Sequence, residues 1–243
     1  MNEFHDPYDV FRDPGLSAAG LNLQAVIAVE DLPDPLQAML AAGVEGAAIR
    51  TLVLFGNGGP GFWRAYCAHP PAPSHPVDSF SRAQVSAFMA RRFAGVSFHF
   101  LYPGDHAVPL QTLGQWVGWH HDSPMRVGIN DTWGLWYAYR ALIGLEQAWP
   151  SSPRVKSHSP CAECVEKPCI AACPAGALAN AALRLNTCID FRLQPASVCA
   201  DQCLARWACP VASEQRYDAA QVQYHYGHSL PHLRQWRSGS GPA

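Results

Sequence analysis

The chain has 243 residues, 49% of them hydrophobic, which is enough to bury one sizeable core and to carry a small additional module. Its formal charge is only −2 and it contains no basic run, so the sequence lacks the electrostatic footprint of a nucleic-acid-binding protein. No apolar run approaches the roughly 20 residues of a membrane span, and residues 1–10 lack an apolar signal segment. We therefore expect a cytoplasmic protein of two units without a membrane partner.

Helix and strand signals are mixed along residues 1–150, which predicts a domain of the α+β class. Asp34-Pro35 begins a helix that Gly43 ends, and Asp78-Ser79 caps a second helix reaching Arg92. Extended runs rich in β-branched and aromatic residues predict strands at 48–55, 96–102 and 136–142.

One segment between these elements, Gly56-Asn57-Gly58-Gly59-Pro60-Gly61, fits the G-x-G-x-x-G pattern of dinucleotide-binding proteins. Asp78 lies about 20 residues further on, as that pattern requires. No second strand intervenes, however, and Asp78 is better explained as a helix cap. We therefore predict a flexible strand-to-helix turn, with a phosphate or cofactor tail at the start of the following helix as the alternative.

The segment Pro150-Ser151-Ser152-Pro153 marks a domain boundary, because proline and serine interrupt an aromatic-rich stretch there. We predict a large domain at 1–150, a cysteine-rich module at 151–215 and a C-terminal tail at 216–243. The tail histidines His225, His228 and His232 have helical metal-site spacing, but Pro231 interrupts it, so a surface tail is expected.

Eight of the nine cysteines lie in the predicted module, in two arrays that each end in Cys-Pro. The first array reads Cys161-x-x-Cys164-x-x-x-x-Cys169-x-x-x-Cys173-Pro174, and the second contains Cys188, Cys199, Cys203 and Cys209-Pro210. This spacing is typical of two 4Fe–4S clusters, in which the cysteine before proline binds the other cluster. The first cysteine set is therefore Cys161, Cys164, Cys169 and Cys209. The second cysteine set is Cys173, Cys188, Cys199 and Cys203.

Zinc is the competing metal for Cys-x-x-Cys units, although the Cys-Pro endings have no role in a zinc ribbon. A disulfide framework is disfavoured by the missing signal segment. The ninth cysteine, Cys67, is expected to be a small buried hydrophobe. Basic residues are common in the module and would raise the reduction potential of a cluster; they are Lys156, Lys167, Arg184, Arg192 and Arg206.

The order of these motifs resembles the epoxyqueuosine reductase family and the related reductive dehalogenases. The resemblance rests on Pro109-Leu110, on Gly118-Trp119 and on the run Ile129-Asn130-Asp131-Thr132-Trp133-Gly134-Leu135-Trp136, followed by the cysteine arrays. It covers roughly residues 96–210. Short matches to cblC-type cobalamin-processing proteins are Thr51-Leu52-Val53-Leu54, His75-Pro76-Val77-Asp78 and Arg216-Tyr217-Asp218 with Gln221 and Tyr224.

This resemblance implies a nitroreductase-like corrinoid-binding domain followed by a two-cluster ferredoxin module. Cobalamin would receive single electrons from the clusters, and cobalt would carry the difficult chemistry. The signature Asp-x-His-x-x-Gly is absent, so no histidine bond to cobalt is predicted through that motif. Candidate corrinoid contacts are the aromatic residues Trp116, Trp119, Trp133 and Trp136, with His120 or His121 beside them. The alternative for each tryptophan is a place in the hydrophobic core, where aromatic residues more often lie.

Asp105 lies close to where the family places an acidic proton donor, in an Asp-x-x-Pro-Leu context, but its spacing to Pro109-Leu110 is one residue longer. Burial beneath a corrin would raise its pKa and allow it to protonate a substrate. Its alternative role is to stabilise the turn Pro103-Gly104-Asp105.

Two other functions remain open at this level. The chain could be a ferredoxin-type electron carrier without corrinoid, although such a carrier does not need a large front domain. It could also carry a flavin in a nitroreductase-like domain, although no phosphate-binding arginine cluster is visible. The chain lacks the helical-repeat extension by which epoxyqueuosine reductases engage tRNA, so a nucleic-acid partner is not expected. Cobalamin or another corrinoid and a redox donor protein are the expected partners.

Overall fold

The computed structural model describes residues 13–42, 48–69, 75–104 and 107–239. The chain forms two compact units, which we describe separately. The first unit contains the described residues up to Gly118 together with Tyr137–Val155, and the second contains Trp119–Trp136 together with the described residues from Lys156 onward. The segment 119–136 is thus grouped with the cysteine-rich residues. The boundaries at 150 and 215 stay predictions.

The first unit is built on a four-stranded antiparallel sheet of order β1-β2-β4-β3. The strands are β1 (Leu23–Ala28), β2 (Thr51–Gly58), β3 (Phe98–Tyr102) and β4 (Tyr137–Leu145). Every residue of β2 is buried, because strands flank both of its edges and helices cover the sheet. The mixed α+β class is confirmed, and the three predicted strands exist with boundaries shifted toward the C-terminus by up to three residues.

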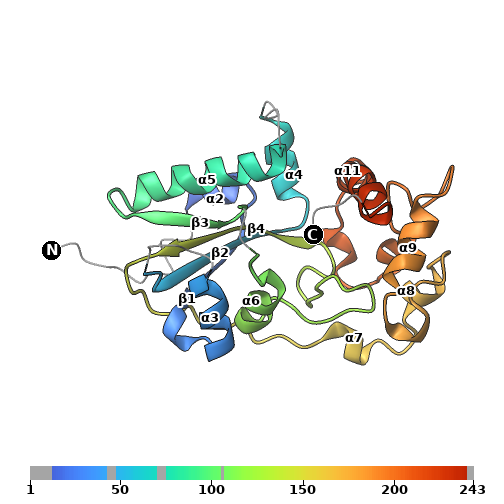
Figure 1. The fold of residues 1–243 in the computed structure, drawn as a ribbon, viewed down its shortest axis with the longest axis horizontal. Helices are drawn as coiled ribbons and strands as arrows, with labels where there is room; N and C mark the ends of the chain where they lie inside the picture. Colours follow the sequence, from blue (N-terminus) through green and yellow to red (C-terminus); the bar gives the residue numbers. More distant parts are fainter. Residues whose placement is uncertain (1–12, 43–47, 70–74, 105–106, 240–243) are drawn as a thin grey trace. The chain divides into compact units, whose positions relative to one another are not determined.

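Helices cover both faces of this sheet. Figure 1 shows α2 (Pro14–Ala18) and α5 (Pro76–Arg92) on one side and α3 (Asp34–Ala42) and α6 (Leu110–Val117) on the other. The helix α5 packs on β2 through the Phe55 and Phe88 rings, whose centroids are 6.1 Å apart. The helices predicted from Asp34 to Ala42 and from Asp78 to Arg92 are confirmed, with α5 beginning two residues earlier at Pro76.

The glycine-rich segment is not a turn throughout: Gly56, Asn57 and Gly58 end β2, Gly59 and Pro60 form the turn, and Gly61 begins α4 (Gly61–Cys67). Both neighbours of β2 are antiparallel to it, so the parallel βαβ unit of a dinucleotide site is not formed here. Side chains hold the turn: the Arg140 Nε donates to Asn57 Oδ1 over 2.6 Å, and Asn22 bonds both backbone groups of Gly58. Asp78 lies in the first turn of α5, where an acidic residue is favourable.

The second unit consists of short helices joined by loops. They are α7 (Pro160–Glu163), α8 (Pro168–Ala171), α9 (Leu185–Arg192), α10 (Leu204–Ala208) and the longer α11 (Ala219–Arg237). Three-residue 3₁₀ turns complete the described elements, at Val29–Asp31 in the first unit and at Ala179–Ala181 and Ser213–Gln215 in the second. The helices α8 and α10 pack against each other.

The segment 119–136 packs onto the end of the second cysteine array. Gly134 has a φ of +53°, and a Cβ there would come within 2.3 Å of the Val211 carbonyl oxygen. Only glycine allows this approach, which explains the Trp133-Gly134 step of the sequence motif. Asn130 holds the turn, because its side chain donates to the Trp119 carbonyl over 3.0 Å and accepts from the Trp133 N–H over 2.7 Å.

Two sequence expectations are wrong. Pro231 does not interrupt the C-terminal segment, which forms the 19-residue helix α11 and continues through this proline. The proline removes one backbone donor from a helix that is otherwise held by its buried residues Gln221 and Val222. Cys67 is exposed at the end of α4 and is therefore not a buried hydrophobe. Among the described residues, no helix is long and apolar enough to cross a membrane.

Candidate metal centre

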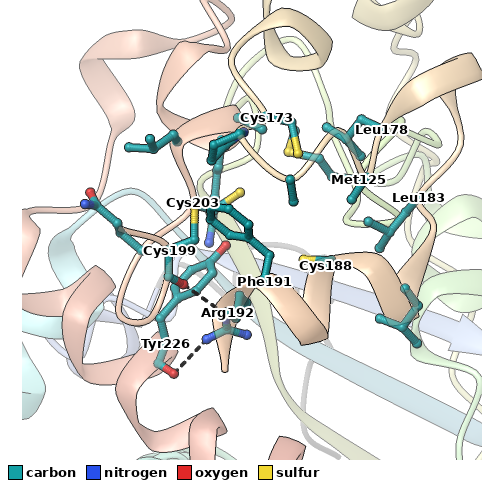
Figure 2. A pocket seen from close by; sticks show the side chains of 18 of the residues that line it. Met125, Cys173, Leu178, Leu183, Cys188, Phe191, Arg192, Cys199, Cys203 and Tyr226 are labelled. Carbon is teal, nitrogen blue, oxygen red and sulfur yellow. Dashed lines mark hydrogen bonds between the residues drawn. The ribbon is translucent and has the colours of Figure 1, made fainter. Parts of the chain in front are cut away.

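Two hollows in the second unit are lined by the two cysteine sets. The larger hollow, of about 210 Å³, is lined by all four residues of the second cysteine set (Figure 2). The smaller hollow, of about 20 Å³, is lined by all four residues of the first cysteine set. Each hollow contains one Cys-Pro step, and neither contains a cysteine of the other set. The structure therefore brings the eight cysteines together in the same two groups of four that their spacing indicates.

The packing of α8 on α10 explains how cysteines from different arrays meet. Cys169 lies within α8, whereas Cys203 and Cys209 are the N-terminal and C-terminal caps of α10. The chain leaves α8 through Cys173-Pro174, which lines the larger hollow with Cys203. It leaves α10 through Cys209-Pro210, which lines the smaller hollow with Cys169. Each array thus contributes its last cysteine to the hollow of the other array.

The thiols within each set influence one another electrostatically. Burial raises the pKa of five cysteines, with smaller contributions from thiols of the same set; these are Cys161, Cys169, Cys188, Cys199 and Cys209. Four thiolates at such close quarters would repel one another in a poorly solvated site. A bound cationic metal group offsets this repulsion, because metal ligation requires the deprotonated thiol.

Basic side chains hold the backbone around both hollows. The Lys167 ammonium donates to the carbonyls of Cys161 and Cys164 over 2.9 and 3.2 Å. The Arg192 guanidinium donates to the carbonyls of Cys199 and Ala200, over 3.1 Å in each case. Arg216 donates to the Cys209 carbonyl over 3.1 Å. These contacts leave the sulfur atoms available while fixing the loops that carry them.

Arg206 and Tyr226 also line the larger hollow. Arg206 donates to the Leu135 carbonyl over 2.5 Å, and its guanidinium lies 4.5 Å from the centre of the Trp136 ring. Its Nε is buried and has no hydrogen-bond partner among the described residues. Burial raises the pKa of Tyr226 to about 12. The nearby Cys203 also raises this pKa, whereas a hydrogen bond from Arg206 lowers it.

The residues present fit iron–sulfur clusters. In each hollow the four thiols are the only thiol, imidazole or carboxylate groups of the described lining. The rest of the smaller lining is mostly apolar, whereas the larger lining also contains Arg192, Gln202, Arg206 and Tyr226. The buried Arg206 Nε also provides a donor that a cluster sulfur would satisfy. Among the described residues, no three Cys, His, Asp or Glu side chains converge on one point where a single metal ion would sit.

The residues predicted to contact a corrinoid lie in different surroundings. Trp136 is fully buried and packs on Trp207 and Tyr217, with ring centroids 5.0 and 5.5 Å away. Trp119 is buried, whereas Trp133 is only half-buried. Trp116 belongs to the first unit, where the Arg154 guanidinium lies 3.3 Å from its ring centre. Asp105 lies outside the described residues. The roles assigned to these residues stay predictions.

His120 and His121 differ in environment, although they are adjacent. His120 is buried, and this burial lowers its pKa although Asp122, 3.6 Å away, raises it. His121 is half-buried, and its Nε2 lies 2.8 Å from the Ser157 hydroxyl. His120 is therefore held in its neutral form at neutral pH.

Further buried side-chain atoms lack hydrogen-bond partners among the described residues. They include the Trp136 Nε1, the Arg216 Nε and both polar side-chain atoms of Gln221, a residue with no exposed surface. An unpaired buried amide is costly, so these groups are candidates for contacts with buried water. Sequence analysis singled out Gln221 only through its match to cblC-type proteins.

Sequence reasoning missed three residues at the hollows. Met125 lines both of them, although it lies 36 positions before Cys161, the first cysteine of the two arrays. Tyr226 and Arg216 come from the segment that was expected to be a tail. None of the three carries a spacing signal, and only the short match around Arg216-Tyr217-Asp218 pointed to one of them.

Comparisons with known proteins show the fold. No family model and no curated protein matches the chain. The fold is similar to that of epoxyqueuosine reductase from Streptococcus thermophilus, with a TM-score of 0.56 at 12% identity, over 88% of this chain and 67% of that one. The fold is also similar to that of the Bacillus subtilis epoxyqueuosine reductase, in a structure with its catalytic aspartate loop swung out of the active site. That comparison has a TM-score of 0.53 at 11% identity and covers 87% of this chain and 66% of that one.

A third structure, epoxyqueuosine reductase with an epoxyqueuosine-modified tRNA-Tyr stem loop, gives a TM-score of 0.52 at 12% identity, over 89% of this chain and 68% of that one. This chain thus spans about two thirds of the length of the proteins that it matches. The resemblance to epoxyqueuosine reductase is confirmed for the fold. Identities this low say nothing about substrate.

Proposed function

We propose that this protein is an iron–sulfur oxidoreductase in which two 4Fe–4S clusters deliver single electrons to a bound corrinoid. The observation that carries the proposal is the arrangement of eight cysteines around two hollows. The cysteine before proline in each array lines the hollow formed by the other array. The reaction is reduction or processing of the corrinoid, or corrinoid-dependent reduction of a small substrate. The N-terminal nitroreductase-like domain, at 1–150, is the expected corrinoid-binding domain.

The first cysteine set would hold one cluster and the second cysteine set the other. Lys167, Arg192 and Arg216 fix the cysteine loops through their carbonyls, and the apolar linings exclude water. When bound, the clusters supply one-electron transfer over a wide range of potentials. At the second cysteine set zinc fits less well, since it would draw four sulfurs to about 2.3 Å from one point, whereas these four cysteines surround a hollow of about 210 Å³.

The corrinoid part of the proposal is supported by the fold similarity. Trp119, His120, Trp133 and Trp136 are the proposed contact set, and Asp105 is the proposed proton donor for a substrate.

The first test is an anaerobic titration of cluster-loaded protein with cob(II)alamin. We expect about eight iron and eight sulfide per chain, four for each cube, together with saturable tryptophan quenching and a shifted cobalt spectrum. Eight iron without corrinoid binding would leave a ferredoxin-type electron carrier. Stoichiometric zinc without sulfide would overturn the cluster assignment itself, and a bound flavin in the purified protein would favour a flavin in the first unit.

One variant sharpens this test. Cys164→Ala should remove the absorbance of one cube and block reduction of bound cobalamin; unchanged cobalt reduction would contradict the proposed electron path.

A further inference from the structure

The two hollows differ in the charge and hydrogen-bond donors of their linings. The larger hollow, around the second cysteine set, is lined by two guanidinium groups, Arg192 and Arg206, and by the phenol of Tyr226. The smaller hollow has Lys167 as the only charged residue in its described lining, and outside that lining Arg216 donates to the Cys209 carbonyl over 3.1 Å. The larger hollow therefore has the greater number of cationic groups in its lining. Figure 2 shows Arg192 and Tyr226 beside Cys199 and Cys203, with Leu178, Leu183 and Met125 across the hollow.

These polar residues are linked to one another. The Arg192 guanidinium lies 4.9 Å from the centre of the Tyr226 ring and donates to the Tyr226 carbonyl over 3.0 Å. A further bond joins Arg192 to the Ser229 hydroxyl over 2.9 Å, which ties α11 to the loop carrying Cys199. The buried Arg206 Nε is the one donor of this group that lacks a partner among the described residues.

Hydrogen bonds to cluster sulfurs and nearby positive charge both favour the reduced, more negative state of an iron–sulfur cluster and so raise its reduction potential. The effect is large where solvent is excluded, because few waters screen the charge. A buried arginine Nε–H without a protein acceptor is costly unless a bound group accepts a hydrogen bond from it.

We propose that Arg206 and Tyr226, supported by Arg192, raise the reduction potential of the cluster held by the second cysteine set above that of the cluster held by the first. Electrons that enter at the first cluster then collect on the second. This inference rests on the proposed function, since it requires that both cysteine sets hold clusters.

The test is a redox titration of the full-length, cluster-loaded protein with dithionite, followed by electron paramagnetic resonance. We expect two midpoints in the unaltered protein. Arg206→Gln and Tyr226→Phe should each move the higher midpoint to lower potential and leave the lower midpoint in place. Lys167→Gln should move the lower midpoint alone, which assigns it to the first cluster. Tyr226→Phe removes only a hydroxyl, so it remains informative if Arg206→Gln does not fold.

Arg184→Gln is the matched control for loss of charge. Arg184 is exposed, donates to the Gly176 carbonyl and lines neither hollow, so its removal should leave both midpoints unchanged. The inference is overturned if Arg206→Gln and Tyr226→Phe leave the higher midpoint in place, or if Arg184→Gln moves it equally. A protein without about eight iron per chain would instead refute the proposed function, and iron analysis before each titration separates the two failures.

Discussion

A single carboxylate, that of Asp13, holds two helices of the first unit together. It caps α2 by accepting from the N–H groups of Gly15 and Leu16 over 2.8 and 3.1 Å, and it forms a 2.7 Å ion pair with Arg91 of α5. Its side chain is 5% exposed, whereas that of Arg91 is 49% exposed. Burial raises the pKa of Asp13, but the hydrogen bonds and charge of its partners outweigh this effect, so the net pKa is lowered.

We predict that Asp13→Ala lowers the free energy of unfolding by about 1–2 kcal/mol, the usual effect of losing an N-cap. Asp13→Asn keeps the cap acceptor and should cost less. Denaturant unfolding of the full chain would measure both. Asp190→Asn is the control, because the Asp190–Arg237 pair is also 2.7 Å long but exposed, and should cost roughly 0–1 kcal/mol. Equal losses at the two sites would contradict the role given to Asp13.

The same carboxylate predicts a pH dependence. The folded pKa lies below the ordinary value of 3.8, so the unfolded chain binds more protons in the acid range. The stabilisation from Asp13 is therefore fully present above pH 3.8 and is lost as the pH falls through the lowered pKa. Asp13→Asn should reduce the fall in stability between pH 5 and pH 3, measured by the same unfolding experiment at each pH.

The segment 119–136 is the element that closes both hollows. Met125 lines each of them, Val127 lines the larger, and Ile129 and Leu135 line the smaller. Gly134 and the turn around Asn130 fix the segment against the end of the second cysteine array. Water exclusion from the clusters therefore depends on residues that precede the cysteines in sequence.

We predict that Met125→Ala makes both clusters more sensitive to oxygen, because it removes an apolar wall common to the two hollows. The rate at which cluster absorbance bleaches in air should rise for both cubes, with iron content before exposure unchanged. Met39→Ala serves as the control, since Met39 is half exposed in the first unit. Faster bleaching of one cube alone would contradict a wall shared by both.

At the scale of the whole molecule, the two units differ in what stabilises them. The first unit has a continuous core around the fully buried strand β2. The cores of the second unit are small clusters, two of which include the cysteines Cys169 and Cys209. Because these cores include the proposed cluster ligands, and because ligand binding and folding are coupled, the second unit would gain much of its stability from the proposed clusters.

We predict two unfolding transitions in anaerobic calorimetry of the full chain. Cluster loading should raise the transition of the second unit by many degrees and leave that of the first nearly unchanged. Proteolysis at rising temperature would assign the transitions, since fragments containing the cysteine arrays should be cut first in the unloaded protein. A single transition that shifts as a whole would show that the units unfold together.

The sequence by itself determined the features that depend on local spacing. The cysteine arrays with their Cys-Pro endings predicted the two groups of four, because ligands of one cluster must recur at short, fixed intervals. Apolar runs likewise predicted the strands β2, β3 and β4, and signals at the helix ends predicted α3 and α5. These signals depend on residues that are adjacent in the chain.

Only the tertiary structure decided what depends on distant residues. It showed that β2 has antiparallel neighbours, that Arg140 holds the glycine-rich turn, and that α11 continues through Pro231. It also placed Met125 and Tyr226 in the linings of the cysteine hollows. The physical reason is that packing and buried hydrogen bonds join residues far apart in the chain. The residue pattern within one segment does not identify the other segment that it contacts.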